Sequence, residues 1–301
     1  MSTPTAKQSS TLPLLRLLRP GQWAKNLFLF IPPFFAGEML HPTLLLRLFI
    51  AFICFSGVAS AIYILNDYRD IESDRAHPEK KKRPLAAGEV VPSVALIIMG
   101  ILALGGLSVA YYLDSGFFIV LLMYAGMNIG YSLGMKNISI LDIMMIAFGF
   151  LLRTVAGGMV VEVPVSQWLV IMIFLLALFL ALAKRRDDLL VGETSGRIMR
   201  KSVKNYNVEY VNACLTVLAG IIIVSYLMYT ISDNVVNRLG ENLYFTSVFV
   251  IAGMMRYLQI ALVENNSGSP TKLLYSDRFL QLTLLAWITS FFVLIYLDNV
   301  L

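Results

Sequence analysis

The sequence predicts an all-α, polytopic membrane protein, and three observations support this fold class. The 301 residues are 58% hydrophobic and only 14% charged, whereas soluble domains carry about 25% charged residues. The mean hydropathy is +0.74, and apolar runs recur along the whole chain. Because a spanning helix needs about 20 apolar residues, these runs predict many spans rather than one anchor. The composition excludes a disordered chain, a coiled coil and a nucleic-acid-binding protein.

Nine segments are long and apolar enough to be spanning helices. The first is short and is interrupted by Pro32 and Pro33. The nine are Ala24–Leu40, Leu44–Leu65, Val91–Leu113, Gly116–Leu133, Ile140–Val161, Gln167–Ala183, Tyr210–Ile231, Tyr244–Val263 and Phe279–Leu297. We expect one integral membrane catalytic domain over residues 1–301, with loops 66–90 and 184–209 forming the mouth of an active site.

The basic residues are distributed unevenly between the two sets of connections. Most of the 24 Lys and Arg residues lie in the N-terminal segment and in alternate loops, whereas the opposite loops hold only Arg47 and Arg238. The positive-inside rule therefore predicts a multi-pass protein of the cell inner (plasma) membrane with its N-terminus in the cytoplasm. With nine spans, the C-terminus is expected outside.

Cysteine and histidine chemistry is not supported. Cys54 and Cys214 both lie in apolar stretches, and His41 and His77 are far apart in sequence. This arrangement excludes a disulfide framework and a zinc-binding pattern. Any metal ion must then be bound by oxygen ligands.

An acidic cluster follows the second predicted span, in the pattern NDxxDxxxD that begins at Asn66. If the helix continues, Asp67, Asp70 and Asp74 lie within about 60° of one another on its surface, because each residue advances about 100°. Such carboxylates repel one another unless a cation binds them, and Mg²⁺ prefers carboxylates together with phosphate oxygens. The pattern predicts a site for a Mg²⁺-diphosphate. The alternative is a solvated loop whose acids pair with Arg69, Arg75 and the lysines that follow.

A basic run, from His77 to Gly88, follows the acidic cluster. Lysine and arginine side chains bind phosphates through charge, and arginine also through two parallel hydrogen bonds. The run would thus serve a phosphorylated substrate. A loop that only sets the topology, attracted to anionic lipids, is the alternative.

A second polar segment opens with Lys184, Arg185, Arg186, Asp187 and Asp188. Neighbouring residues on a helix point about 100° apart, so the two aspartates cannot both face one ion. We expect Asp188 to join the metal ligands. The three cations either bind substrate phosphates or mark the topology, and the sequence does not separate these alternatives.

Two arginines fall inside predicted spans, where a charge is costly unless it faces the bundle interior or a wet cavity. We expect Arg153 to be functional. For Arg256, which lies near the cytoplasmic end of its span, a structural pairing with an acid or a carbonyl is an equal alternative.

These motifs resemble the UbiA superfamily of intramembrane prenyltransferases, whose nine helices surround a central cavity with two aspartate-rich motifs at its cytoplasmic mouth. Within that superfamily the chain is most similar to the decaprenyl-phosphate phosphoribosyltransferases. The similar segments are RPGQWAKN (19–26), NDYRDIESDRAHPEKKKRPLAAG (66–88), YSLGMKN (131–137), LLRTVAGG (151–158), AKRRDD (183–188) and SDRFLQ (276–281).

The resemblance implies roles for individual residues. It places metal-binding acids at Asp67, Asp70, Asp74 and Asp188. It places substrate-binding residues at Lys25, Asn66, His77, Lys80, Lys81, Arg83, Tyr131, Lys136, Arg153, Lys184 and Arg185. The chain departs from the aromatic prenyltransferases because it lacks a full second DxxxD motif, which favours the phosphoribosyl branch. It also has Lys82 where an aromatic residue is usual in that branch.

The implied reaction is Mg²⁺-dependent transfer of 5-phosphoribose from phosphoribosyl diphosphate to a polyprenyl phosphate, with release of diphosphate. Lys80, Lys81 and Arg83 would hold the ribose 5-phosphate, and Lys25, Lys136 or Arg153 the lipid phosphate. An aromatic prenyltransferase is the alternative among enzymes. A lipid transporter is disfavoured because the chain shows no evident internal repeat. The expected partners are the two substrates and the bilayer, and no motif indicates an oligomeric state.

Overall fold

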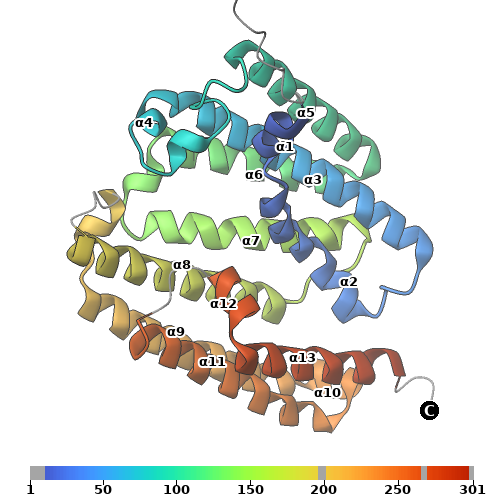
Figure 1. Cartoon of the computed structure of the whole chain (residues 1–301). Coiled ribbons are helices and arrows are strands. Elements are labelled where there is room, and N and C mark those ends of the chain that lie inside the picture. Colours follow the sequence, from blue (N-terminus) through green and yellow to red (C-terminus); the bar gives the residue numbers. More distant parts are fainter. Residues whose placement is uncertain (1–10, 196–200, 266–269, 298–301) are drawn as a thin grey trace, which may run out of the picture.

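The computed structural model describes residues 11–195, 201–265 and 270–297, which form helices and no strand (Figure 1). This confirms the all-α prediction. The elements in chain order are α1 (Thr11–Leu18), η1 (Pro20–Phe30), α2 (Ile31–Ala36), α3 (Pro42–Arg69), α4 (Ile71–Arg75), η2 (Lys80–Lys82), α5 (Pro92–Leu113), α6 (Ser115–Leu133), η3 (Met135–Asn137), α7 (Leu141–Val160), α8 (Gln167–Ser195), η4 (Lys201–Asn205), α9 (Val208–Thr230), α10 (Asp233–Leu239), η5 (Glu241–Thr246), α11 (Ser247–Leu262), α12 (Pro270–Ser276), α13 (Arg278–Phe292) and η6 (Val293–Leu297).

Eight helical segments in the described part of the chain are long and apolar enough to cross a membrane. They correspond to the second to ninth predicted spans, so the protein is a multi-pass membrane protein. The first predicted span differs, because it is divided into the 3₁₀-helix η1 and the short helix α2. Pro32 and Pro33 lie in the first turn of α2, where a missing N–H breaks no helical hydrogen bond. The prolines thus start a new helix instead of continuing η1.

Helix α8 is much longer than predicted. It was expected to end at Ala183, but it continues to Ser195. Residues 184–188 are good or moderate helix formers, and no glycine or proline occurs before Gly192. The second polar segment therefore begins on a helix that extends from the bundle, not in a loop.

Side-chain caps fix the beginnings of several spans. An Asp114 carboxylate oxygen accepts a hydrogen bond from the Phe117 N–H of α6 at 2.6 Å. Asn207 caps α9 in the same way through Tyr210 N–H, at 2.8 Å. Each cap satisfies one of the four N–H groups that have no partner in the first turn of a helix.

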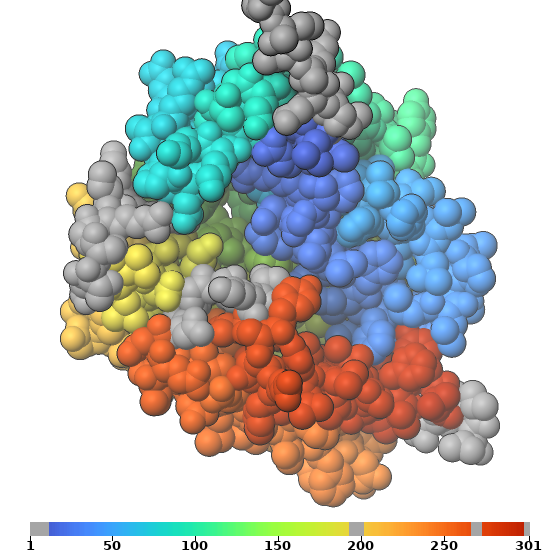
Figure 2. Space-filling model, in the orientation of Figure 1, coloured from blue at the N-terminus to red at the C-terminus, as the bar shows by residue number. Residues whose placement is uncertain are grey.

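The spans pack in a closed sequence of neighbours. α3 packs against α5, α5 against α6, and so on through α7, α8, α9, α11 and α13. The N-terminal segment closes the arrangement, because η1 packs on α3 and α7 while Phe35 of α2 contacts Phe291 of α13. Figure 2 shows the surface hollowed between the dark blue N-terminal segment, the cyan loop and the yellow and orange segments, with green helices behind.

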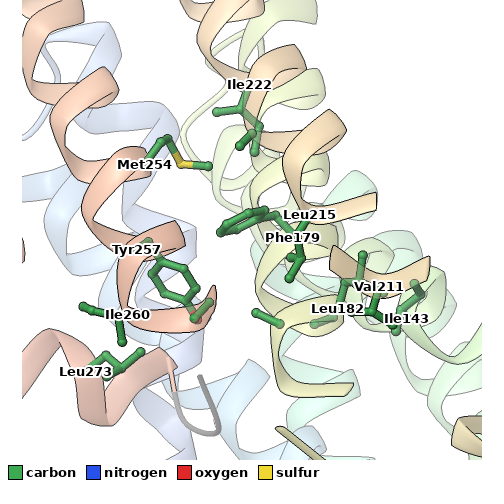
Figure 3. Close-up of a cluster of buried hydrophobic side chains, with 14 of the residues drawn as sticks. Ile143, Phe179, Leu182, Val211, Leu215, Ile222, Met254, Tyr257, Ile260 and Leu273 are labelled. Atoms are coloured by element: carbon green, nitrogen blue, oxygen red, sulfur yellow. The ribbon is translucent and has the colours of Figure 1, made fainter. Parts of the chain in front are cut away.

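The largest apolar core lies between α8, α9 and α11 (Figure 3). Phe179 of α8 is fully buried and meets the Tyr257 ring of α11 edge-on, with 5.2 Å between ring centroids. Leu215 and Ile222 of α9 pack against the same cluster. Aromatic pairs of this geometry add about 0.5–1.5 kcal/mol beyond area burial. This core fixes the position of α8, which carries the second polar segment.

Candidate active site

The first acidic motif lies at a break between two helices. α3 ends at Arg69, Asp70 has φ −97° and ψ 8°, and α4 begins at Ile71. The backbone still follows a helical path, since Asp74 N–H donates to the Asp70 carbonyl at 2.8 Å. The prediction of a continuous helix is therefore wrong in detail, although Asp67 and Asp74 remain on one side of the chain.

Asp67 and Asp74 are buried, with side chains only 2% exposed, and two arginines neutralise them. Arg83 Nη1 lies 3.0 Å from Asp67 Oδ1 and 2.7 Å from Asp74 Oδ2. Arg19 Nη2 lies 2.5 Å from Asp67 Oδ1, and its guanidinium stacks over the Tyr63 ring. Asp67 Oδ2 is buried and has no hydrogen-bond partner. One carboxylate oxygen of the motif is thus buried without a partner.

Asp70 lies apart from this pair. Its Oδ2 is 3.9 Å from Lys136 Nζ, and both side chains are more than a third exposed. Among the described residues, no three carboxylate, histidine or cysteine side chains gather closely enough to bind a metal ion. The structure brings two of the three predicted acids together and connects the third to Lys136.

The residue types nevertheless fit a hard divalent cation. The donors are carboxylate oxygens, which Mg²⁺ prefers, and the partnerless Asp67 Oδ2 is available for a further ligand. Two buried carboxylates also need positive charge nearby, because an unpaired buried charge is very costly. Arg19 and Arg83 supply that charge here.

The second polar segment is organised by a buried ion pair that the sequence analysis did not identify. Arg185 is 1% exposed, and its Nε donates to Asp142 Oδ2 at 2.7 Å. Its Nη1 contacts Asp188 Oδ2 at 3.1 Å. Ser202 Oγ also donates to Asp142 Oδ2, at 3.1 Å. Asp142 therefore fixes Arg185, and Arg185 fixes Asp188.

The loop with Lys136 is attached to the same unit. Ile140 N–H donates to the Tyr206 hydroxyl at 2.5 Å, and Ser139 Oγ donates to the Ser202 carbonyl at 2.6 Å. Burial raises the pKa of Tyr206, so its phenol is neutral at physiological pH. These contacts join η3 to η4, which places the loop of Lys136 beside the C-terminal end of α8.

Arg153 is buried in the bundle, and only neutral groups bind it. Its Nε donates to Asn26 Oδ1 at 2.8 Å, and Nη2 donates to the Tyr124 hydroxyl at 2.8 Å. Nη1 donates to the Gly149 carbonyl at 2.7 Å. The guanidinium also lies over the rings of Phe55 and Tyr124. Among the described residues it has no carboxylate partner, so its positive charge is not neutralised.

Lys25 lies near this charge. The cations of Arg153, Lys184 and Arg19 all act electrostatically on its ammonium group, and within the described chain it has no carboxylate partner. The segment that carries it is held on α3 by two hydrogen bonds. Trp23 Nε1 donates to Ser60 Oγ at 3.0 Å, and Asn26 Nδ2 donates to Ser56 Oγ at 2.9 Å. Arg153 is buried and Lys25 is exposed, and the two form a second group of cations without a carboxylate partner in the described chain.

The basic run forms a turn around η2. The Nδ1 atom of His77 accepts hydrogen bonds from the N–H groups of Glu79 and Lys80, at 3.2 and 3.3 Å. Lys80, Lys82 and Arg83 line an open pocket beside Asp67, whereas Lys81 is not among the lining residues. His77 thus shapes the turn that carries these cations.

The remaining predicted residues occupy the same end of the bundle. The Asn66 carbonyl accepts the Asp70 N–H at 3.0 Å, and Tyr131 lies close enough to act electrostatically on Arg185.

Arg256 forms two ion pairs: its Nη2 contacts Asp277 Oδ2 at 2.7 Å, and its Nη1 contacts Glu264 Oε1 at 2.7 Å. Arg256 is thus paired with acids, which is the structural role that the sequence left as one of two alternatives.

Three residues that hold other side chains of the site in place were not predicted from the sequence: Arg19, Asn26 and Asp142. Arg19 and Asn26 lie in the RPGQWAKN segment. For Arg19, the sequence signal was a cation that directly precedes Pro-Gly and lies next to an apolar run. For Asp142 the signal was an acid in the first turn of an otherwise apolar helix. In each case the partner lies more than 40 residues away in sequence, so spacing could not reveal it.

Fold and site together define a multi-pass helical membrane protein with two buried carboxylates paired to arginines, and with a second group of cations that has no carboxylate partner in the described chain. The match to the description "UbiA prenyltransferase family" extends over residues 27–283. The chain therefore belongs to the UbiA prenyltransferase family and is a transferase.

Individual relatives support this assignment. The decaprenyl-phosphate phosphoribosyltransferase of Mycolicibacterium smegmatis is 33% identical over 293 residues, which cover 94% of this chain and 92% of the relative. The Corynebacterium glutamicum protein of the same name is 32% identical and covers 94% of this chain and 87% of the relative.

Solved structures share the fold. A UbiA homologue from Archaeoglobus fulgidus bound to GPP and Mg²⁺ matches with a TM-score of 0.66 at 18% identity, covering 94% of this chain and 99% of that one. A digeranylgeranylglyceryl phosphate synthase structure matches with a TM-score of 0.67 at 19% identity, covering 96% and 99%.

Proposed function

We propose that the protein transfers 5-phosphoribose from phosphoribosyl diphosphate to a polyprenyl phosphate. An oxygen of the lipid phosphate forms a bond to C1 of the ribose. The bond from C1 to the diphosphate oxygen breaks, and the diphosphate leaves with the electron pair. The products are polyprenyl-phosphoryl-phosphoribose and diphosphate.

One structural observation supports two phosphorylated substrates. The buried carboxylates Asp67 and Asp74 pair with a first set of cations, Arg19 and Arg83, whereas a second set, Arg153 and Lys25, has no carboxylate partner in the described chain. Prenyl transfer to an aromatic acceptor involves only one phosphorylated substrate. The names of the relatives agree with this proposal, since they describe a phosphoribosyltransferase acting on decaprenyl phosphate.

The proposed roles follow from charge and position. Asp67, Asp70 and Asp74, with Asp188, would hold Mg²⁺, which stabilises negative charge on a departing diphosphate when it is bound. Lys25 and Arg153, whose charges have no carboxylate partners in the described structure, would receive the lipid phosphate. That phosphate is already anionic at neutral pH, so no general base is needed. The protein's main task is to position two anions.

The test is a transfer assay with the purified protein in detergent. It contains Mg²⁺, ribose-labelled phosphoribosyl diphosphate and a polyprenyl phosphate, and it measures label in the organic phase. We expect EDTA to abolish the signal. Asp67→Asn and Asp74→Asn should each lower turnover about 100-fold, because each removes a metal-binding charge. The matched control is Asp233→Asn, an exposed aspartate on α10. Full activity of both site variants at saturating Mg²⁺ would refute the metal assignment.

The other candidate is transfer of a prenyl group from its diphosphate to an aromatic acceptor. It has one supporting observation, the shared fold with UbiA homologues bound to GPP or DMAPP. The same protein preparation should be assayed with labelled geranyl diphosphate and 4-hydroxybenzoate. Product in that assay, and none from phosphoribosyl diphosphate, would favour this candidate.

A further inference from the structure

The guanidinium of Arg153 is a buried positive charge that its surroundings support but do not neutralise. The residue is 5% exposed, and its three hydrogen bonds go to an amide oxygen, a phenol and a backbone carbonyl. The rings of Phe55, Tyr124 and Phe150 lie 5.3, 4.6 and 5.6 Å from its central carbon. Aromatic faces attract a cation without removing its charge. Such a charge inside a helical bundle is costly, and it therefore indicates a function.

The amide that contacts this charge belongs to Asn26 of η1, the segment that packs on α7 (Figure 1). Asn26 is 1% exposed. Its Oδ1 accepts from Arg153 Nε at 2.8 Å, and its Nδ2 donates to Ser56 Oγ of α3 at 2.9 Å. Because arginine can only donate hydrogen bonds, the amide oxygen must face Arg153. The two neighbours thus fix the orientation of the amide.

A carboxylate would fit in the same place. Aspartate has nearly the same size and shape as asparagine, and one of its oxygens would accept from Arg153 Nε. The other would accept the hydroxyl proton of Ser56, since a hydroxyl can donate as well as accept. The chain does contain a buried ion pair of this kind, Arg185 with Asp142. Hydrogen-bonding geometry therefore does not explain why position 26 holds an amide.

The difference between the two residues is the charge that they leave on Arg153. The three hydrogen bonds of the guanidinium use one N–H group each, so two of its five N–H groups have no acceptor in the described structure. Arg153 also acts electrostatically on Lys25, the residue before Asn26. A carboxylate at position 26 would neutralise this charge internally, whereas the amide leaves it for an anionic ligand.

We infer that Asn26 is a positioning residue that sets the charge specificity at Arg153. Its uncharged amide orients the guanidinium and leaves the positive charge for the phosphate of the polyprenyl substrate. The inference rests on the proposed function, in which Arg153 receives the lipid phosphate. It adds that the neutrality of the amide, and not only its hydrogen bond, is required.

The experiment compares two substitutions in the transfer assay. Asn26→Asp should raise the KM for polyprenyl phosphate about 100-fold, because a strong charge-assisted contact with the ligand is lost. It should leave the KM for phosphoribosyl diphosphate unchanged and should not lower the unfolding midpoint. Asn26→Ala keeps the charge but not its orientation, so its KM should rise only about 10-fold while its unfolding midpoint falls. A purely structural role predicts the opposite order, since aspartate keeps both hydrogen bonds and alanine keeps neither.

Binding without turnover isolates the charge. Calorimetry of the protein in detergent, without donor, compares farnesyl phosphate with farnesol, which lacks the phosphate. Asn26→Asp should weaken the binding of farnesyl phosphate about 100-fold and leave that of farnesol unchanged. The matched control is Asn207→Asp, the same chemical change at an exposed residue that caps α9. Aspartate and asparagine cap helices about equally well, so this variant should bind both ligands as wild type does.

Three results would overturn the inference. The first is an equal effect of Asn26→Asp on both ligands, or no effect on farnesyl phosphate. The second is a lower unfolding midpoint for Asn26→Asp than for Asn26→Ala, because the position would then not accept a carboxylate. The third is weaker binding of 4-hydroxybenzoate with unchanged binding of farnesyl phosphate, which would assign the charge to a carboxylate acceptor. Absence of lipid product with wild type would refute the proposed function alone, since the binding measurements require no turnover.

Discussion

Asp142 and Arg185 form the most completely buried ion pair of the site, with side chains 0% and 1% exposed. Removal of one partner from such a pair leaves an uncompensated buried charge, which typically costs about 3–5 kcal/mol. We expect Asp142→Asn to lower the free energy of unfolding by an amount in that range. The measurement is denaturant or thermal unfolding in detergent.

The double variant Asp142→Leu with Arg185→Met is the control for this prediction. Apolar residues of similar volume often replace a buried pair at little cost, so the double variant should recover stability. It should not recover transfer activity, because Asp188 loses the contact that fixes it. An unfolding midpoint of Asp142→Asn equal to that of wild type would contradict the structural role.

Asp277 makes stability depend on pH in a defined direction. The hydrogen bond from Arg256 is the main cause that lowers the pKa of Asp277. An acid with a lowered folded-state pKa contributes stability above its unfolded pKa of about 3.9, and this is lost as pH falls through the folded value. The difference in unfolding midpoint between wild type and Asp277→Asn should be largest at pH 7 and should disappear in acid.

Asparagine is a suitable replacement at this position because it also caps helices well, and Asp277 caps α13 through Leu280 N–H. Arg256→Gln should produce the same loss, since it removes the cause of the lowered pKa. A wild-type advantage that persists unchanged to pH 2 would exclude this ion pair as the source.

The residue types of the site were predictable, but most of its pairings were not. The spacing of Asp67 and Asp74 placed them on one side of the chain, and the structure confirms that they share a partner. That partner, Arg83, is brought back by the turn around η2, whose geometry the residue pattern does not specify. The neutral partners of Arg153 come from elements up to 127 residues away. Only the tertiary fold brings them together.

At the scale of elements, one close approach holds the N-terminal segment in place. A Cβ atom at Gly157 of α7 would lie 1.9 Å from the Leu29 carbonyl oxygen of η1. Gly157→Ala should therefore push η1 away from α7 and displace Arg19, Lys25 and Asn26. We expect a lower unfolding midpoint together with a large loss of transfer activity.

Gly126→Ala on α6 is the matched control, because no heavy atom lies within 4 Å of the added Cβ. Alanine is favoured over glycine inside a helix by about 1 kcal/mol, so this variant should be as stable as wild type or more so. If Gly157→Ala behaves like Gly126→Ala, the tight contact between η1 and α7 is not needed.

The spans were predicted well where one apolar run forms one helix. The prediction placed the third span at Val91–Leu113, and the helix is Pro92–Leu113. The prediction of the spans was wrong where the end of an apolar run is not the end of a helix. Hydropathy measures transfer into lipid, so it ended α8 where the charges begin, although the hydrogen-bonded helix continues to Ser195. For the same reason it merged η1 and α2 into one span.

At the scale of the whole molecule, the N-terminal segment decides the topology. It lies antiparallel to α3, because Trp23, Asn26 and Phe30 contact Ser60, Ser56 and Phe52 in turn. From Ser60 to Pro42, α3 rises about 27 Å at 1.5 Å per residue, which is close to the roughly 30 Å hydrocarbon core of a bilayer. We therefore expect the N-terminal segment to cross the membrane beside α3, although it is not one long helix.

With this expected crossing the chain would pass the membrane nine times, whereas the eight long helices found in the described part of the chain would alone return the C-terminus to the side of the N-terminus. We expect alkaline phosphatase fused after Leu301 to be active outside a bacterial cell, and the same enzyme fused after Glu89 to be inactive. The two fusions differ because Glu89 follows the basic run, which the positive-inside rule keeps in the cytoplasm. Fluorescent protein should report the reverse at both positions. An inactive phosphatase at Leu301 together with a fluorescent fusion there would mean that the N-terminal segment does not cross, and the mouth of the site would need a new orientation.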